Sequence, residues 1–284
     1  EIEYLRNHFQ FHPLDLADCL SPIQRPKLDE YENYVFMILT FPYWNREARA
    51  IMSSEIGFFI GAGYLVTVSD SKLPPINKFF EQCRVNDIFR VKFLNHNPVQ
   101  LLAEVINRMQ LYLYPILDHI SADIDNVEKV IFEGYEKKMV KEILLIRGNI
   151  ISFRKTMQAH KNVIKKLINA KEKFFITNNT HLYLNNILEQ TKDIWDILDG
   201  LKEYIDALHN TNESLISFRL NDIMKILTII SVTLLPASLI INIFGMNTAK
   251  MPLVERADSF WIILGMMAGV IIILLGYFKR KNWL

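Results

Sequence analysis

Polar and small side chains recur at helical spacing within an otherwise apolar stretch near the end of the chain. Steps of three and four residues connect the eight members of this polar stripe: Asn221, Met224, Thr228, Ser231, Leu235, Ser238, Asn242 and Gly245. Such spacing places all eight on one face of a helix. Amide and hydroxyl oxygens can contact a hydrated cation, whereas an Asn that faces lipid leaves its amide unpaired. The stripe indicates either close helix packing or the wall of a pore, and its two Asn favour the pore.

Two uncharged runs, each nineteen residues long, surround the short segment that follows the stripe. The first extends from Ile226 to Phe244, and the second from Phe260 to Phe278. A helix of about 20 apolar residues crosses the hydrocarbon core of a bilayer. We therefore predict two membrane-spanning helices, at about 226–244 and 260–278, joined by a loop at 245–259.

Basic residues flank the two predicted spans unequally. Arg219 and Lys225 precede the first span and residues 279–281, Lys-Arg-Lys, follow the second, whereas the connecting loop contains two basic residues. Basic residues near a span favour the cytoplasmic side. This bias predicts a multi-pass protein of the cell membrane with both termini in the cytoplasm.

The composition argues against several classes of function. A net charge of +1 provides no basic field for nucleic acid. The pair of glycines at Gly61 and Gly63 precedes a predicted strand, whereas a dinucleotide-binding loop follows one. We find no catalytic motif and expect neither enzymatic activity nor a resident cofactor.

The region before the spans divides into two parts. Residues 1–95 are predicted to form an α/β domain, because β-forming runs occupy 34–39, 56–60 and 64–68 and a helix is expected from Pro74 to Cys83. Residues 96–217 are predicted to form long helices, at 98–133, 138–172 and 178–244. The third helix continues into the membrane region, which we place at 218–284.

The third predicted helix also carries a heptad pattern. Its apolar positions alternate steps of four and three: Ile187, Thr191, Ile194, Leu198, Leu201, Ile205 and Leu208. This pattern predicts a left-handed helix bundle, formed within one chain or between several.

Several segments together identify a family resemblance. Gly245-Met246-Asn247 lies at the end of the first span, and Met251-Pro252 follows in the loop. Residues 12–18, 25–34, 59–68 and 221–230 have further matching segments. Over nearly its whole length the chain resembles the CorA family of magnesium channels.

This resemblance implies a fold and an assembly. The expected fold is an α+β cytoplasmic funnel domain, with a mixed sheet and flanking helices, whose long stalk helix continues into a two-helix transmembrane hairpin. The expected assembly is a homopentamer in a lipid bilayer. The implied function is passive transport of divalent cations, namely Mg2+ with Co2+ or Ni2+ as further cargo, through a pore lined by the first span.

The resemblance also implies roles for individual residues. Gly245, Met246 and Asn247 would form the selectivity filter, with Asn247 holding hydrated Mg2+ through its waters, because Mg2+ loses its water shell reluctantly. The implied pore-lining residues are Asn221, Met224, Leu227, Thr228, Ser231, Leu235, Ser238 and Asn242. Met224 and Leu227 would form a hydrophobic constriction.

Some features leave alternatives open. Asn186 falls where an interface Asp would help hold a regulatory Mg2+, so the presence of that site is uncertain. A zinc transporter of the ZntB type would share the fold, although Met246 argues against it. A membrane-anchored coiled-coil signalling protein is a third interpretation, but it would give the polar stripe and Asn247 no purpose.

Overall fold

The computed structural model describes residues 2–21, 24–95, 97–170, 178–246 and 258–283. The chain divides into two compact units, Glu1–Asn210 and Thr211–Leu284. The first unit contains a sheet and most of the helices, and the second contains the apolar C-terminal part of the helix Asn178–Phe244 and the apolar helix Ser259–Arg280. We describe each unit by itself.

A four-stranded sheet organises the first unit, in the order β1 (Lys27–Glu30), β2 (Tyr34–Asn45), β3 (Ala50–Gly61) and β4 (Tyr64–Ser69). The three predicted strands lie within β2, β3 and β4, whereas β1 was not expected. All three pairings are antiparallel in the described residues, rather than mixed as expected. The connections are too short for the crossover that parallel neighbours need. Gly63, with φ of 87°, occupies the tight β3–β4 turn.

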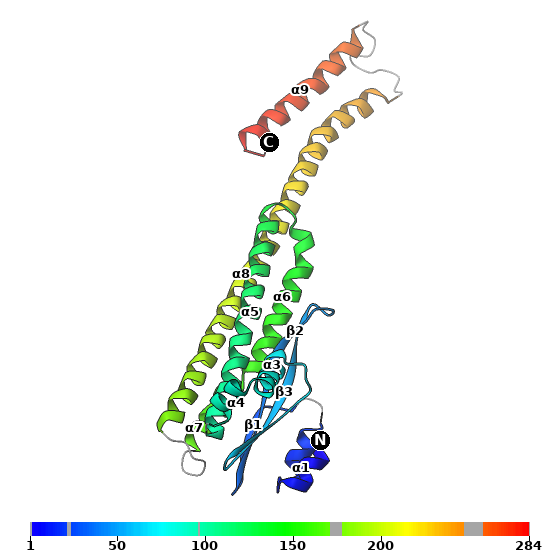
Figure 1. The fold of residues 1–284 in the computed structure, drawn as a ribbon. Helices are drawn as coiled ribbons and strands as arrows, with labels where there is room; N and C mark the ends of the chain where they lie inside the picture. The colour runs from blue at the N-terminus through cyan, green and yellow to red at the C-terminus, as the bar shows by residue number, and fades with distance from the viewer. Residues whose placement is uncertain (1, 22–23, 96, 171–177, 247–257, 284) are drawn as a thin grey trace. The chain divides into compact units, whose positions relative to one another are not determined.

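Helices cover both faces of this sheet (Figure 1). Two short helices, α1 (Ile2–His8) and α2 (Pro13–Asp18), pack on one face. The other face packs against α3 (Pro74–Val85), α5 (Pro98–Phe132), α7 (His160–Asn169) and the beginning of α8 (Asn178–Phe244). The fold class is therefore an α+β domain with flanking helices, as the sequence predicts.

The predicted helix at 138–172 is wrong as a single element. The structure has α6 (Glu136–Met157) and α7, separated at Gln158 and Ala159. His160 begins α7 and is fully buried, with its side chain against the backbone of Thr40 in β2. This tertiary contact accompanies the break, and neither Gly nor Pro marks it in the sequence.

The heptad pattern of α8 is confirmed as a buried seam, since all seven of its residues are buried. Gln110 of α5 donates hydrogen bonds from Nε2 to the carbonyl oxygen of Ile187, at 3.1 Å, and to Oγ1 of Thr191, at 2.7 Å. The seam therefore packs against another helix of the same chain at Ile187 and Thr191. At these positions one chain forms the helix bundle.

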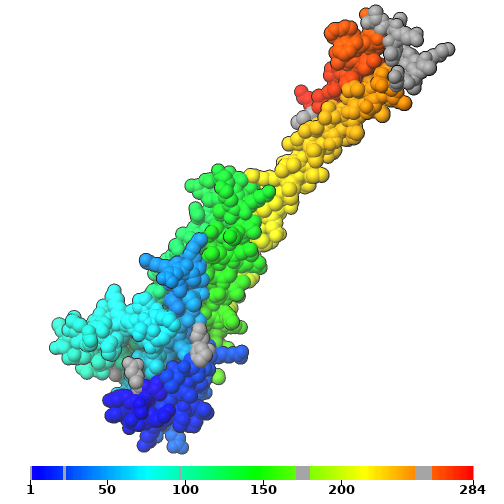
Figure 2. All heavy atoms as spheres, turned by 90° about the vertical axis from the view of Figure 1, so that its right-hand side faces the viewer, coloured from blue at the N-terminus to red at the C-terminus, as the bar shows by residue number. Residues whose placement is uncertain are grey.

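One arginine attaches a side lobe to the long helices. Figure 2 shows α3 and α4 (Asp87–Leu94) in cyan at the side of the first unit. The guanidinium carbon of Arg108 in α5 lies 4.6–5.5 Å from the ring centroids of Phe79, Phe89 and Phe93. Its Nε also pairs with Glu104 at 2.6 Å. These cation–π contacts fix the lobe to α5.

Candidate functional site

The second unit contains the C-terminal part of α8 and α9 (Ser259–Arg280), and both helices are long and apolar enough to cross a membrane. The C-terminal end of α9 meets α8 just before the first apolar run, where Lys225 Nζ donates a hydrogen bond to the carbonyl oxygen of Asn282 at 3.1 Å. The two helices thus form the hairpin that the uncharged runs predict.

One face of α8 is covered within this unit. Ile229, Thr233 and Ala237 follow one another at four-residue spacing and are 6%, 7% and 4% exposed. Among the described residues of the unit, α9 is the other helix available to cover them. Among the described residues, the buried hydroxyl of Thr233 has no hydrogen-bond partner. Sequence reasoning missed this face, although the four-residue spacing was a usable signal.

The polar stripe lies on the opposite side of α8. From Ile229 to Asn242 the helix turns through ~1300°, which leaves Asn242 ~220° around the axis. Asn242 is exposed, and so are Asn221, Ser231 and Ser238. Thr228 is half-buried at the edge of the stripe. The hairpin therefore covers one side of α8 and leaves the side with the amides and hydroxyls open.

Apolar side chains interrupt this open side near its beginning and at its centre. Met224 and Leu227 are 58% and 54% exposed, near the beginning of the first apolar run, and Leu235 is also exposed. Thr228 donates its hydroxyl proton to the carbonyl oxygen of Met224 at 2.7 Å. Its oxygen keeps its capacity to accept a hydrogen bond, which suits contact with the waters around a cation.

Gly245 ends α8 in a tight turn. Its amide donates to the carbonyl oxygen of Ile241 at 2.8 Å, and a Cβ at position 245 would lie 3.1 Å from the same oxygen. A larger residue would displace this last turn. Met246 follows and is exposed. Asn247 lies outside the described residues, so its role as the selectivity residue stays a prediction.

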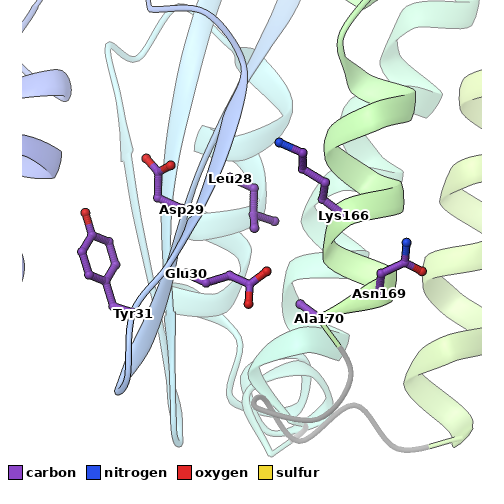
Figure 3. A pocket seen from close by; sticks show the side chains of 7 residues that line it. All are labelled: Leu28, Asp29, Glu30, Tyr31, Lys166, Asn169 and Ala170. Atoms are coloured by element: carbon purple, nitrogen blue, oxygen red, sulfur yellow. The ribbon is translucent and has the colours of Figure 1, made fainter.

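A polar pocket of about 600 Å³ lies between β1 and α7 in the first unit (Figure 3). Glu30 and Lys166 are among the side chains that line it. Asp29, the next acid along β1, pairs with Lys27 at 2.5 Å, and Lys27 also contacts Asp18 of α2. Because one of the two acids is already paired with a lysine, this pocket is a poor candidate for a cation site.

A regulatory metal site finds no support from side chains of a single chain. Within the described ranges, no group of three or more His, Cys, Asp and Glu side chains is placed to hold a metal. Asn186 is exposed on α8 and lines a cavity of about 510 Å³ together with Lys92, Glu104 and Arg108. The sequence leaves open whether position 186 helps hold a regulatory Mg2+, and that question stays open.

Comparisons with known proteins agree with this architecture. The family model described as CorA-like Mg2+ transporter protein matches residues 1–280. The cobalt/magnesium transport protein CorA of Thermotoga maritima is 26% identical over all of this chain and 80% of its own length. The complete structure of the CorA magnesium transporter from Methanocaldococcus jannaschii matches with a TM-score of 0.86 at 22% identity, covering 100% of this chain and 88% of that one.

A more distant likeness concerns the zinc alternative. The ZntB cytoplasmic domain from Vibrio parahaemolyticus matches with a TM-score of 0.52 at 14% identity. It covers 74% of this chain and 83% of that one. This likeness indicates a shared fold over that share of the chain and carries nothing about the transported ion.

Proposed function

The chain belongs to the CorA-like Mg2+ transporter family, and from this premise we propose that it conducts Mg2+ passively across the cell membrane. Co2+ and Ni2+ are further divalent cargo of the same pathway. The observation that carries the proposal is the polar stripe on the side of α8 that the hairpin leaves open.

The pore requires several copies of the chain. One hairpin of two helices cannot enclose a channel, and exposed amides such as those of Asn221 and Asn242 are costly against lipid. Copies related by a rotation axis can turn their stripes toward that axis and shield them. We propose a homopentamer, the assembly that the family resemblance implies, with the first span of each copy lining the pore.

Selection and closure occur at opposite ends of this pore. Asn247 is proposed to hold hydrated Mg2+ through its waters, because an amide ring attracts the ion without the tight binding of a carboxylate ring. Met224 and Leu227 are proposed to form the constriction, which closes by excluding water. Both termini are placed in the cytoplasm, on the side of the basic residues.

Two threonines on opposite faces of α8 provide a matched test. Thr228→Val removes a hydroxyl from the stripe, whereas Thr233→Val removes an unpartnered hydroxyl from the covered face. Mg2+ flux into liposomes should fall several-fold in the first variant and stay near wild type in the second. Equal flux in both variants would contradict a pore wall on the open face.

The same liposomes separate the alternative functions. Flux measured with Zn2+ in place of Mg2+ tests the zinc transporter, and faster Zn2+ than Mg2+ entry would favour it. Failure to conduct either ion, in a preparation that retains its oligomeric state, would favour a signalling role.

A further inference from the structure

A cleft of about 510 Å³ lies in the first unit between α4 and the N-terminal parts of α5 and α8. Lys92 of α4 lines it, together with Glu104, Asn107 and Arg108 of α5 and Tyr183 of α8. This volume is within the range of clefts that hold small organic ligands. All of the lining residues precede the membrane hairpin, so the proposed pore does not account for the cleft.

The arginine of this cleft is held in place and has donors to spare. The guanidinium group of Arg108 lies against three phenylalanine rings, and its Nε donates to Glu104 at 2.6 Å. Among the described residues, neither Nη group of Arg108 has a hydrogen-bond partner. The rings restrict the side chain, so these donors are oriented before a ligand arrives. Such preorganisation reduces the entropy that binding loses.

An asparagine one position before Arg108 is oriented by a hydrogen bond. Gln190 Nε2 donates to Asn107 Oδ1 at 3.0 Å. Since the oxygen of Asn107 accepts this bond, its NH2 group is the part that remains to donate. Lys92 adds further donors, because it is exposed and forms no ion pair with a described residue. Three side chains from two helices thus present hydrogen-bond donors to one cleft.

The charge of the cleft agrees with its donors. Lys92 and Arg108 are positive, and Glu104 is negative but already paired with Arg108. Within the described chain, no other Asp or Glu side chain lines the cleft. The cleft therefore suits an anion that offers several acceptor oxygens. A phosphate group fits this description, because Arg and Lys bind it through charge-assisted hydrogen bonds.

The cleft also has room and a surface for a ring. Its volume exceeds what a phosphate group alone would fill, and the ring of Tyr183 is exposed at its wall. Aromatic side chains stack on nucleotide bases, whichever base is present. A ligand with a phosphate group and a base would therefore use both parts of the cleft.

We propose that this cleft binds a nucleoside phosphate, with the phosphate group on Arg108, Asn107 and Lys92 and the base against Tyr183. The inference goes beyond the proposed function, because it assigns a ligand to the first unit and does not depend on the pore. A nucleotide bound here would contact α4, α5 and α8 together. Its binding should therefore raise the unfolding temperature of the protein.

The test uses two matched pairs of variants of the full chain in neutral detergent. Asn107→Asp keeps the shape of the side chain and the acceptor for Gln190, but replaces the free donor with a negative charge. Asn162→Asp makes the same change at an exposed position of α7 outside the cleft. Lys92→Gln and Lys161→Gln each remove one exposed cation, the first inside the cleft and the second outside it. Calorimetric titration with adenosine monophosphate measures binding, and unfolding temperatures without ligand verify that each variant is folded.

The wild type is expected to bind adenosine monophosphate. Asn107→Asp should weaken this binding by roughly tenfold or more, and Lys92→Gln by about fivefold, whereas both control variants should bind like the wild type. Lys92→Gln keeps the test available if Asn107→Asp does not fold. A wild type that does not bind would overturn the proposal. Unchanged binding in both cleft variants would do the same, as would an equal loss in the controls.

Smaller probes separate the two parts of the ligand. Ribose 5-phosphate and inorganic phosphate lack the base, and adenosine lacks the phosphate group. The wild type should bind adenosine monophosphate more tightly than any of the three, and Tyr183→Leu should remove its advantage over ribose 5-phosphate. Equal affinity for adenosine would overturn the phosphate contact, and equal affinity for inorganic phosphate would overturn the nucleoside.

Discussion

His160 donates a hydrogen bond from Nε2 to the carbonyl oxygen of Thr40 over 2.6 Å, which ties the first turn of α7 to β2. The imidazole is fully buried, and its edge meets the ring of Phe41. Nδ1 has no partner. A proton added there would place a charge in an apolar site without a hydrogen-bond acceptor, so burial lowers the pKa of His160 to about 4.

This low pKa predicts a loss of stability in weak acid. The unfolded chain binds the proton of this histidine near its ordinary pKa of 6.5, whereas the folded chain binds it only near 4. The contribution of the neutral imidazole is therefore complete above about pH 6.5 and is lost as the pH falls toward 4, by about 3 kcal/mol in total. Thermal unfolding of the full chain in detergent, across this range, measures the effect. His160→Gln should remove this part of the pH dependence, and parallel curves for both proteins would contradict the assignment.

The hydrogen bond between Tyr34 and Asp15 is expected to contribute to stability. The hydroxyl of Tyr34 donates to Asp15 Oδ2 at 2.8 Å and accepts from the amide of His12 at 2.7 Å. Burial raises the pKa of Asp15 although Tyr34 and Tyr31 both donate to it. Tyr34→Phe removes the hydroxyl that bonds both Asp15 and the amide of His12. It should therefore lower the free energy of unfolding by about 1–3 kcal/mol. Tyr31→Phe removes only the hydrogen bond to Asp15 Oδ1, from a less buried position, and should lower the free energy of unfolding by less. The unfolding temperatures of the two variants and the wild type measure the difference.

Substitution of Leu227 is expected to change the leak of Mg2+ rather than the stability of the protein. It is 54% exposed on the open side of α8, where the proposed constriction lies. Leu227→Asn should hydrate the closed pore and increase Mg2+ leak at high internal Mg2+. Leu227→Met, which keeps the position apolar, should leave the leak unchanged. Flux from loaded liposomes measures both, and an unchanged leak in Leu227→Asn would move the constriction to Leu235.

Substitution of Asn247 is expected to abolish Mg2+ flux without preventing folding. Asn247→Ala removes the proposed amide contact with the waters of Mg2+ and should abolish Mg2+ flux, while the unfolding temperature stays near that of the wild type. Asn247→Asp has nearly the same shape but should bind the ion tightly and slow its exit. Mg2+ uptake by liposomes distinguishes the three proteins. Normal uptake by an assembled Asn247→Ala variant would refute the role.

Long elements were predictable because their evidence is local. The expected helix at 178–244 coincides with α8, and Pro236 does not interrupt it. The expected helix at 98–133 differs from α5 by one residue, and Asn97 caps its beginning by accepting from the amide of Val99. In both cases, regular apolar spacing continues over many turns and decides the structure.

Short elements and breaks were not predictable in the same way. The residues of α4 carry no strong helical pattern, and Phe89 packs with Arg108 of another helix. The separation of α6 from α7 accompanies a contact between His160 and Thr40, which are far apart in sequence. The stripe itself could be predicted from spacing. Its position opposite the covered residues required the burial of Ile229, Thr233 and Ala237 to be known.

The open face of α8 has a genetic consequence. Each chain contributes a single wall to the proposed pore, so a cell with equal amounts of normal and defective chains would assemble mostly mixed channels. With five independent positions per ring, roughly 3% of the pentamers would contain normal chains alone. A stripe substitution that permits assembly would then behave as dominant, whereas a substitution that prevents folding would behave as recessive.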